Sequence, residues 1–262
     1  MRMSFIQSYC ISHTMKRLFA LILFYFSSTS TAIAAEEEIK VAVFLEPPFV
    51  DYIDNQWQGE NIDMIKLLSQ RVQLTPKFIR CPFARCLTMV KKGQADLIMG
   101  VMKSKERAEY LTFIEPPYLL QHKPLRFFTL ANNNITINNI DDLTPLIVGT
   151  IRGASYHHEF DNNHSMKKVA ITSREQLVKM LLKGHIDTFI EREESIKPLL
   201  STQDYQQKLA LANYLYDDPV GSYIAISKKT SIQRYAKPLA QQLHKMISSG
   251  EFQQIRAHYQ LR

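Results

Sequence analysis

The stretch FARCLTMVKKGQADLIMG (83–100) predicts a helix followed closely by a strand. Leu87 and Val90 are three residues apart, which places them on one face of a helix that ends near Gly93. The apolar run ADLIMGV (95–101) predicts a buried strand. A helix followed directly by a buried strand is typical of an alternating α/β fold.

The same alternation extends upstream of this stretch. IKVAVF (39–44) and PKFIR (76–80) are typical of strands, and the segment between them carries apolar residues at helical spacing. Those residues follow Gly59 and are Ile62, Ile65, Leu68 and Val72. Strand and helix therefore alternate as a βαβαβ unit, which predicts a parallel sheet with right-handed crossovers.

A second βαβαβ unit begins about 100 residues later. Its strands are predicted at LIVGT (146–150), KKVAI (167–171) and IDTFI (186–190). One helix is expected to open at SYHHEF (155–160). Another is expected from a capping box of Ser173 and Gln176 through Leu182. The fold class is therefore α/β, with two mainly parallel sheets flanked by helices.

Two such units predict two lobes with a cleft between them, because parallel sheets bind ligands beyond the carboxyl ends of their strands. PPYLLQHKPLRFF (116–128) leaves the first unit, and GSYIAIS (221–227) returns after the second. Lobe 1 is therefore predicted to be discontinuous, with residues 36–125 and 222–262. Lobe 2 is predicted to be residues 126–221, with a hinge between the lobes.

Residues 1–35 are predicted to be a leader and signal peptide. Lys16 and Arg17 form a charged start, 18–26 is a short apolar region, and 32–35 offers small residues for cleavage. The apolar region is about nine residues, against roughly twenty needed to span a bilayer. Export to the periplasm is the expected consequence.

The remaining 227 residues are enough for one large domain or two small lobes. The full chain has a formal net charge of +7 from 32 basic and 25 acidic residues. Three of the basic residues and none of the acids lie in 1–35, so the rest carries 29 minus 25, or +4. Its Lys and Arg residues are scattered rather than interleaved with aromatics, which argues against nucleic-acid binding.

Cys81 and Cys86 are the cysteines that remain after residue 35. In an oxidising compartment they are expected to form a disulfide, which would close a very small loop and add about 2 kcal/mol of stability. The alternative is two reduced, partly buried thiols. Their spacing is not that of a redox CxxC motif, and two thiols alone make a poor zinc site.

The order of the motifs resembles that of the periplasmic solute-binding proteins of family 3, the polar amino-acid type. The matching motifs are spread over residues 39–259: Pro48-Phe49, Gly59 with Asp63, Gly93 with Asp96, Ser104-Lys105-Glu106-Arg107 and Pro117-Tyr118. The resemblance implies a type II periplasmic-binding fold that closes over a small solute. It also implies a monomer that needs no cofactor and delivers its solute to an inner-membrane ABC permease.

In lobe 1 the resemblance implies that Arg107 clamps a ligand carboxylate, since guanidinium matches a carboxylate bidentately. Ser104 would add a hydroxyl, and Phe83 would be an aromatic wall of the pocket. Glu46 stands where many relatives carry an aromatic residue, and its carboxylate would suit a ligand amine. The segment from Asp96 to Arg107 is one residue shorter than the usual family spacing.

In lobe 2 the loop Arg152-Gly153-Ala154-Ser155 lies between a strand and a helix. Gly153 permits close backbone approach, and the helix start favours an anion. Ser155 either contacts the carboxylate, as in relatives, or caps the helix, and both can hold together.

A second departure from the family lies at the amine-binding position of lobe 2. Relatives often bind the ligand amine with an Asp five residues after an earlier Asp. Counting from Asp187, that position is Arg192, with Glu191 before it. Either Glu191 takes the role, or the ligand lacks that ammonium and is more acidic.

Binding of a small polar, carboxylate-bearing solute is the leading hypothesis, with no catalysis and no metal site. One alternative is a periplasmic enzyme resembling cyclohexadienyl dehydratases, for which Glu46 or Glu191 could serve as acid or base. Another is a sensory module that presents its closed form to a membrane receptor.

Overall fold

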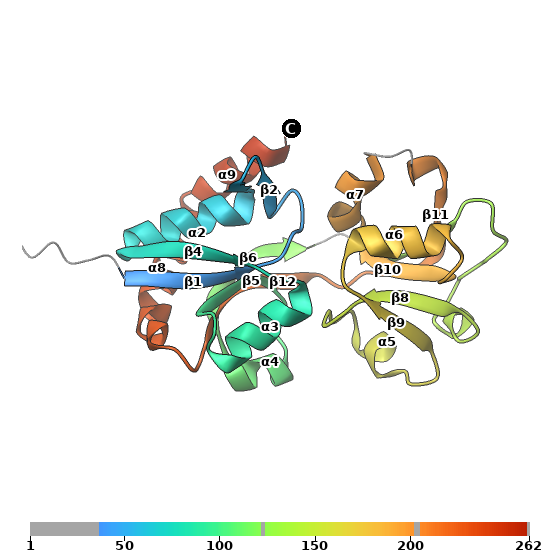
Figure 1. Ribbon diagram of the computed structural model, residues 1–262, viewed down its shortest axis with the longest axis horizontal. Coiled ribbons are helices and arrows are strands. Elements are labelled where there is room, and N and C mark those ends of the chain that lie inside the picture. Colours follow the sequence, from blue (N-terminus) through green and yellow to red (C-terminus); the bar gives the residue numbers. More distant parts are fainter. Residues whose placement is uncertain (1–36, 122–123, 202–204, 261–262) are drawn as a thin grey trace, which may run out of the picture. The chain divides into compact units, whose positions relative to one another are not determined.

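The structure is a computed structural model that describes residues 37–121, 124–201 and 205–260. Its described residues form two five-stranded sheets and a β-hairpin of β2 (Asp51–Ile53) and β3 (Gln56–Gln58). The predicted leader, 1–35, lies outside the described residues. The α/β class with two helix-flanked sheets is confirmed (Figure 1).

The first sheet has the strand order β4-β1-β5-β12-β6. Its strands are β1 (Glu37–Val43), β4 (Leu74–Arg80), β5 (Leu97–Val101), β6 (Leu111–Gln121) and β12 (Val220–Ser227). β1, β4 and β5 are parallel, as the alternating pattern predicted. β12 lies antiparallel between β5 and β6, so the chain returns to this sheet after building the second one.

Helices cover both faces of the first sheet. Below, this sheet and its helices are called lobe 1; the helices are α2 (Glu60–Arg71), α3 (Phe83–Lys92), α4 (Lys105–Tyr110), α8 (Ala236–Ser248) and α9 (Glu251–Gln260). α2, α8 and α9 share one buried core, which includes Ile62, Leu243 and Phe252. α3 contributes Cys86 and Val90 to the core on the other face (Figure 1).

The second sheet has the strand order β11-β7-β10-β8-β9. Its strands are β7 (Leu125–Leu130), β8 (Ile147–Ile151), β9 (Lys167–Ile171), β10 (Thr188–Arg192) and β11 (Leu209–Tyr216). β8, β9 and β10 are parallel, while β7 is antiparallel to β10 and to β11. The predicted second βαβαβ unit is therefore present.

Lobe 2 denotes this sheet with α5 (His158–Asn162), α6 (Arg174–Leu182) and α7 (Glu193–Ser201). α6 and α7 pack on one face through residues such as Leu177 and Ile196. α5 lies on the opposite face and buries Phe160 together with Ile137 and Leu143 (Figure 1). Short 3-10 turns cover Asp141–Leu143, Tyr205–Gln207 and Ser231–Tyr235.

The helix expected to open at 155 begins at His158 instead. The ring Nδ1 of His157 accepts a hydrogen bond from the Phe160 N–H, so His157 is the cap. Ser155 therefore does not cap this helix. Ser173 does cap α6 as predicted, accepting from the Gln176 N–H, while the Gln176 side chain bonds the Thr172 hydroxyl.

Gly59 fixes the loop that follows β1. Its φ of +124° is one that other residues rarely adopt, and a Cβ there would lie 2.4 Å from the Phe49 carbonyl oxygen. The same carbonyl accepts a hydrogen bond from the Asn61 N–H at 3.0 Å. The absence of a side chain at Gly59 thus lets the start of α2 pack on the 46–50 loop, which carries Glu46.

Glu60, the first residue of α2, is a buried acid with one basic neighbour. It is 1% exposed, and its Oε2 lies 3.5 Å from the Arg256 Nε of α9. Its Oε1 has no hydrogen-bond partner within the described part of the chain. Burial raises the pKa of the Glu60 carboxyl above its ordinary value, and Arg256 offsets this only in part.

We expect the stability of the Glu60→Gln variant to increase relative to that of the unaltered protein when the pH is raised from about 4 to about 7. A carboxyl whose pKa is raised by folding stabilises the fold below its ordinary pKa of 4.5. It loses that contribution as the pH rises through the higher folded value. Glutamine cannot ionise, so urea unfolding should show the free energy of unfolding of the variant rising relative to that of the unaltered protein between the two pH values. A stability difference that is equal at both pH values would contradict this expectation.

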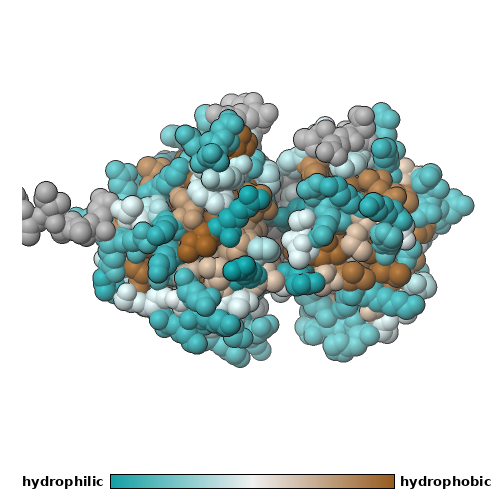
Figure 2. Space-filling view, in the orientation of Figure 1, coloured by the Kyte–Doolittle hydropathy of each residue, from teal (hydrophilic) through white to brown (hydrophobic). Residues whose placement is uncertain are grey.

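No helix within the described ranges is long and apolar enough to cross a membrane. On the face shown in Figure 2, hydrophobic residues appear in patches between hydrophilic ones. The candidate functional site lies at the ends of the strands and is described next.

Candidate functional site

A cavity of about 340 Å³ is lined by residues of both lobes. Its lining comes from the carboxyl ends of all six parallel strands of the two βαβαβ units. These contributions are Phe44 to Glu46 after β1, Arg80 to Phe83 at β4, Met102 after β5, Ile151 and Ser155 at β8, Thr172 to Arg174 after β9, and Glu191 and Arg192 in β10. The volume is of the size that holds a small solute.

Arg107 is a buried cation in the wall of this cavity. Its side chain comes from α4, whose first turn is capped by Ser104, and the residue is 4% exposed. Nη1 donates to the Met102 carbonyl at 2.9 Å, and Nη2 donates to the Gly153 carbonyl at 3.0 Å. Nη2 also lies 3.5 Å from the Ser155 Oγ, a long and weak contact.

The hydrogen-bond partners of Arg107 are therefore neutral, and within the described ranges it forms no ion pair. Burial lowers the pKa of its guanidinium below the ordinary value. Arginine nevertheless stays charged in proteins, so the site holds a positive charge that an anion in the cavity would neutralise.

Phe83 forms an aromatic wall beside this cation. The Arg107 guanidinium carbon lies 5.7 Å from the centre of the Phe83 ring, and the Phe44 ring meets Phe83 edge-on at 4.7 Å. Phe83 is the first residue of α3 and packs against hydrophobic clusters of both lobes. Phe83 is among the residues that line the cavity, and its contact with a ligand stays a prediction.

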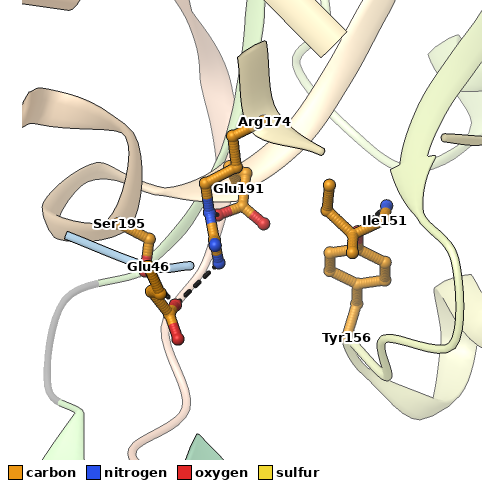
Figure 3. Close-up of polar contacts among 6 residues, drawn as sticks. All are labelled: Glu46, Ile151, Tyr156, Arg174, Glu191 and Ser195. Atoms are coloured by element: carbon orange, nitrogen blue, oxygen red, sulfur yellow. Dashed lines mark hydrogen bonds and ion pairs between the residues drawn. The ribbon is translucent and has the colours of Figure 1, made fainter. Parts of the chain in front are cut away.

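Two carboxylates, Glu46 and Glu191, share one arginine in another part of the cavity lining, called the acidic corner below (Figure 3). Arg174, the first residue of α6, donates from Nε to Glu191 Oε2 and from Nη2 to Glu46 Oε1, each at 2.7 Å. The Ser195 hydroxyl donates to the same Glu46 oxygen at 3.2 Å. Glu46 belongs to lobe 1 and the other three to lobe 2, so these bonds join the lobes.

Burial and charge act against each other in this corner. Burial alone would lower the pKa of Arg174, but Glu191 and Glu46 outweigh it and the pKa is raised. Burial raises the pKa of Glu191 above its ordinary value, because the Arg174 charge compensates only in part. Arg174 and Glu191 therefore influence each other's charged state.

The loop that carries Ser155 is held by Tyr156. The Ile151 N–H donates to the Tyr156 hydroxyl oxygen at 2.7 Å (Figure 3). The Tyr156 N–H in turn donates to the Asp161 carboxylate. Burial raises the pKa of the Tyr156 hydroxyl, so it remains a neutral structural group.

Three sequence-predicted residues are not among those that line the cavity: Ser104, Arg152 and Gly153. The Ser104 hydroxyl is engaged as the cap of α4. Arg152 is exposed and donates to the Ala170 carbonyl at 3.1 Å, at the edge strand β9. Gly153 contributes through its carbonyl, which Arg107 binds, and a Cβ there would lie 3.2 Å from the Ala84 Cβ of lobe 1.

The remaining predicted positions, Glu46, Phe83, Arg107, Ser155, Glu191 and Arg192, all line the cavity. Arg174, Ser195 and Arg80 line it too and were not predicted. The position of Arg174 in the site could have been predicted, because Arg174 directly follows Ser173, the cap of α6. The start of a helix after a parallel strand lies at the ligand-binding edge of the sheet.

Cys81 also lines the cavity, and its sulfur lies 2.05 Å from that of Cys86. The pair links the end of β4 to α3 in one hydrophobic cluster. That the two are bonded in the exported protein stays a prediction. Thiol labelling of unfolded, unreduced protein that begins at residue 36 should find no free sulfhydryl, whereas two labelled cysteines would refute the bond.

Several known proteins share this architecture. The histidine-binding periplasmic protein of Escherichia coli K12 is 22% identical over 183 residues, which covers 66% of this chain and 68% of that protein. A mutant of ArgBP from T. maritima has a TM-score of 0.73 at 16% identity, covering 86% of this chain and 96% of that one. The GluR0 ligand-binding core from Nostoc punctiforme, solved with L-glutamate, has a TM-score of 0.68 at 19% identity, covering 84% and 98%.

The structural likenesses show the fold, which these proteins share in spite of low identity. A family match covers far more of the chain than any single motif and extends over residues 39–262. It includes the strands, the loops and the helices that build the cavity. The chain therefore belongs to the bacterial extracellular solute-binding proteins, family 3.

Proposed function

We propose that this protein binds a small, carboxylate-bearing solute of the amino-acid type in the periplasm. The observation that carries the proposal is Arg107, a buried cation with neutral partners in the wall of a cavity of about 340 Å³. A solute carboxylate would supply a counter-charge in direct contact with Arg107 through two parallel N–H···O bonds. Phe83 and Ser155 would complete this half of the site.

Contacts from both lobes give the proposal a mechanism. Arg107 belongs to lobe 1, and it already bonds Gly153 of lobe 2. A solute held by Arg107 of lobe 1 and Ser155 of lobe 2 would stabilise the arrangement in which the lobes meet. The solute-bound protein would then be the form that an inner-membrane ABC permease recognises, with the binding protein acting as a monomer.

The named relatives support binding rather than catalysis. They include a histidine-binding periplasmic protein and a ligand-binding core solved with L-glutamate. The dehydratase-like alternative would need Glu46 or Glu191 as an acid or base, yet both carboxylates are engaged by Arg174. This engagement favours a structural and recognition role for the two acids.

A thermal-shift screen of residues 36–262 against amino acids and organic acids tests the proposal. A solute at 100 times its dissociation constant should add about 2.7 kcal/mol to the free energy of unfolding. Mass spectrometry should then recover that solute unchanged. Consumption of the solute would show that the protein is an enzyme instead.

A further inference from the structure

The charged side chains of the cavity do not balance. Its described lining contains four arginines and two glutamates: Arg80, Arg107, Arg174, Arg192, Glu46 and Glu191. Four positive charges minus two negative charges leave +2. A charge of this sign in a partly enclosed cavity attracts anions and repels cations.

The two acids are already occupied. Arg174 bonds both carboxylates at 2.7 Å, and the Ser195 hydroxyl adds a bond to Glu46. The side chains of Arg174, Glu46 and Glu191 are only 21%, 12% and 7% exposed. A cationic group of a solute could bind these acids fully only by displacing Arg174, which would leave a largely buried guanidinium without a counter-charge.

The cationic side of the cavity is open to a solute by comparison. Neither Arg107 nor Arg80 forms an ion pair with a residue in the described ranges. Arg107 is fixed by backbone carbonyls, and Arg80 extends from the exposed end of β4. Two groups of a solute can therefore be matched with positive charges without breaking an existing pair.

We propose that the solute is a dicarboxylic acid, with or without an α-amino group, and that Arg174 determines this preference. The inference rests on the proposed function and names the solute class of the same site. Two carboxylates carry the charge of −2 that balances the cavity. Arg174 excludes solutes with a basic side chain because it holds the acidic corner that such a side chain would need.

Calorimetry with solutes of matched length tests the proposal on residues 36–262. The probes are L-glutamate, glutarate, L-glutamine and L-lysine. We expect L-glutamate or glutarate to bind at least tenfold more tightly than L-glutamine, and L-lysine to show no measurable binding. A protein that binds L-lysine or L-glutamine as tightly as the acids overturns this inference while leaving the proposed function intact.

Two variants separate the role of Arg174 from a general effect of charge. Arg174→Gln frees both carboxylates, so L-lysine should gain at least tenfold in affinity relative to L-glutamate. Arg174→Lys keeps the charge and should keep the preference for acids, which provides a test even if the glutamine variant does not fold. Arg234→Gln is the matched control, since Arg234 pairs with Glu37 at the opposite end of β1.

The outcomes distinguish a failure of the inference about Arg174 from a failure of the proposed function. An unchanged ratio of L-lysine to L-glutamate affinity in a folded Arg174→Gln variant shows that Arg174 does not determine the solute class. A wild-type protein that no amino acid or organic acid stabilises overturns the proposed function and this inference with it. A preference for acids that is lost in Arg174→Gln and kept in Arg234→Gln supports both.

Discussion

Arg107→Ala should weaken solute binding by more than about tenfold while the fold stays intact. Losing one partner of a buried, charged hydrogen bond typically costs about 2–5 kcal/mol of binding, and each 1.4 kcal/mol is a factor of about ten. Arg107 is a buried cation that forms no ion pair within the described part of the chain. Its loss therefore removes the anchor for the acidic group.

Arg107→Lys should also weaken binding, because an ammonium cannot reproduce the planar fork that holds a carboxylate. Calorimetry on both variants with one identified solute gives the comparison, and circular dichroism checks that they are folded. Arg234→Ala serves as the control, since its side chain is 58% exposed and its partner Glu37 begins β1, away from the cavity edge.

Arg256 lies on the terminal helix and therefore looks like a suitable control, but it would be a poor one. Its guanidinium lies beside the buried Glu60, so removing it would disturb the core of lobe 1. If Arg107→Ala binds like the unaltered protein, the acidic group is held elsewhere. The shortened segment between Asp96 and Arg107 would then be the reason for the wrong position.

The strands and helices of this fold could be predicted because their signals are local. Buried runs such as those of β1 and β5 are continuous in the sequence, and Gly93 does end α3 in the left-handed conformation. The start of α5 was wrong by three residues. Ser155 and His157 can each cap a helix, and sequence alone does not decide which one bonds the backbone.

The site could be predicted only where a motif or a strand end carried it. Arg107, Phe83 and Glu191 line the cavity, because the carboxyl ends of the strands determine where it forms, while their contacts with a ligand stay predictions. Arg152 does not, because its guanidinium turns to a carbonyl of the edge strand. The pairing of Arg174 with Glu46 joins residues 128 positions apart in different lobes, and no local pattern encodes such a contact.

Arg174→Met should lower the free energy of unfolding by about 3–5 kcal/mol at neutral pH. Removing one partner of a buried ion pair leaves uncompensated charge, which is costly because it cannot be solvated. Here one substitution leaves two carboxylates without their counter-charge, those of Glu46 and Glu191, whose side chains are 12% and 7% exposed. Urea unfolding of the solute-free protein at about pH 7 measures the loss.

The pH dependence of this loss identifies its cause. The pKa of Glu191 is raised by burial even with Arg174 present, and removal of the cation raises it further. A raised carboxyl pKa stabilises the fold below its ordinary value and loses that contribution as the pH rises. The deficit of Arg174→Met should therefore be smaller at about pH 4 than at about pH 7.

A matched variant and a rescue complete the test. Arg234→Met removes an arginine from an exposed ion pair, and such pairs contribute little to stability, so this variant should unfold like the unaltered protein. Adding Glu46→Gln and Glu191→Gln to Arg174→Met removes the stranded charges and should recover most of the lost stability. Equal stability of Arg174→Met and the unaltered protein at both pH values would show that water solvates this corner. In that case Arg174 could leave the two acids at little cost, and it would not exclude a basic solute.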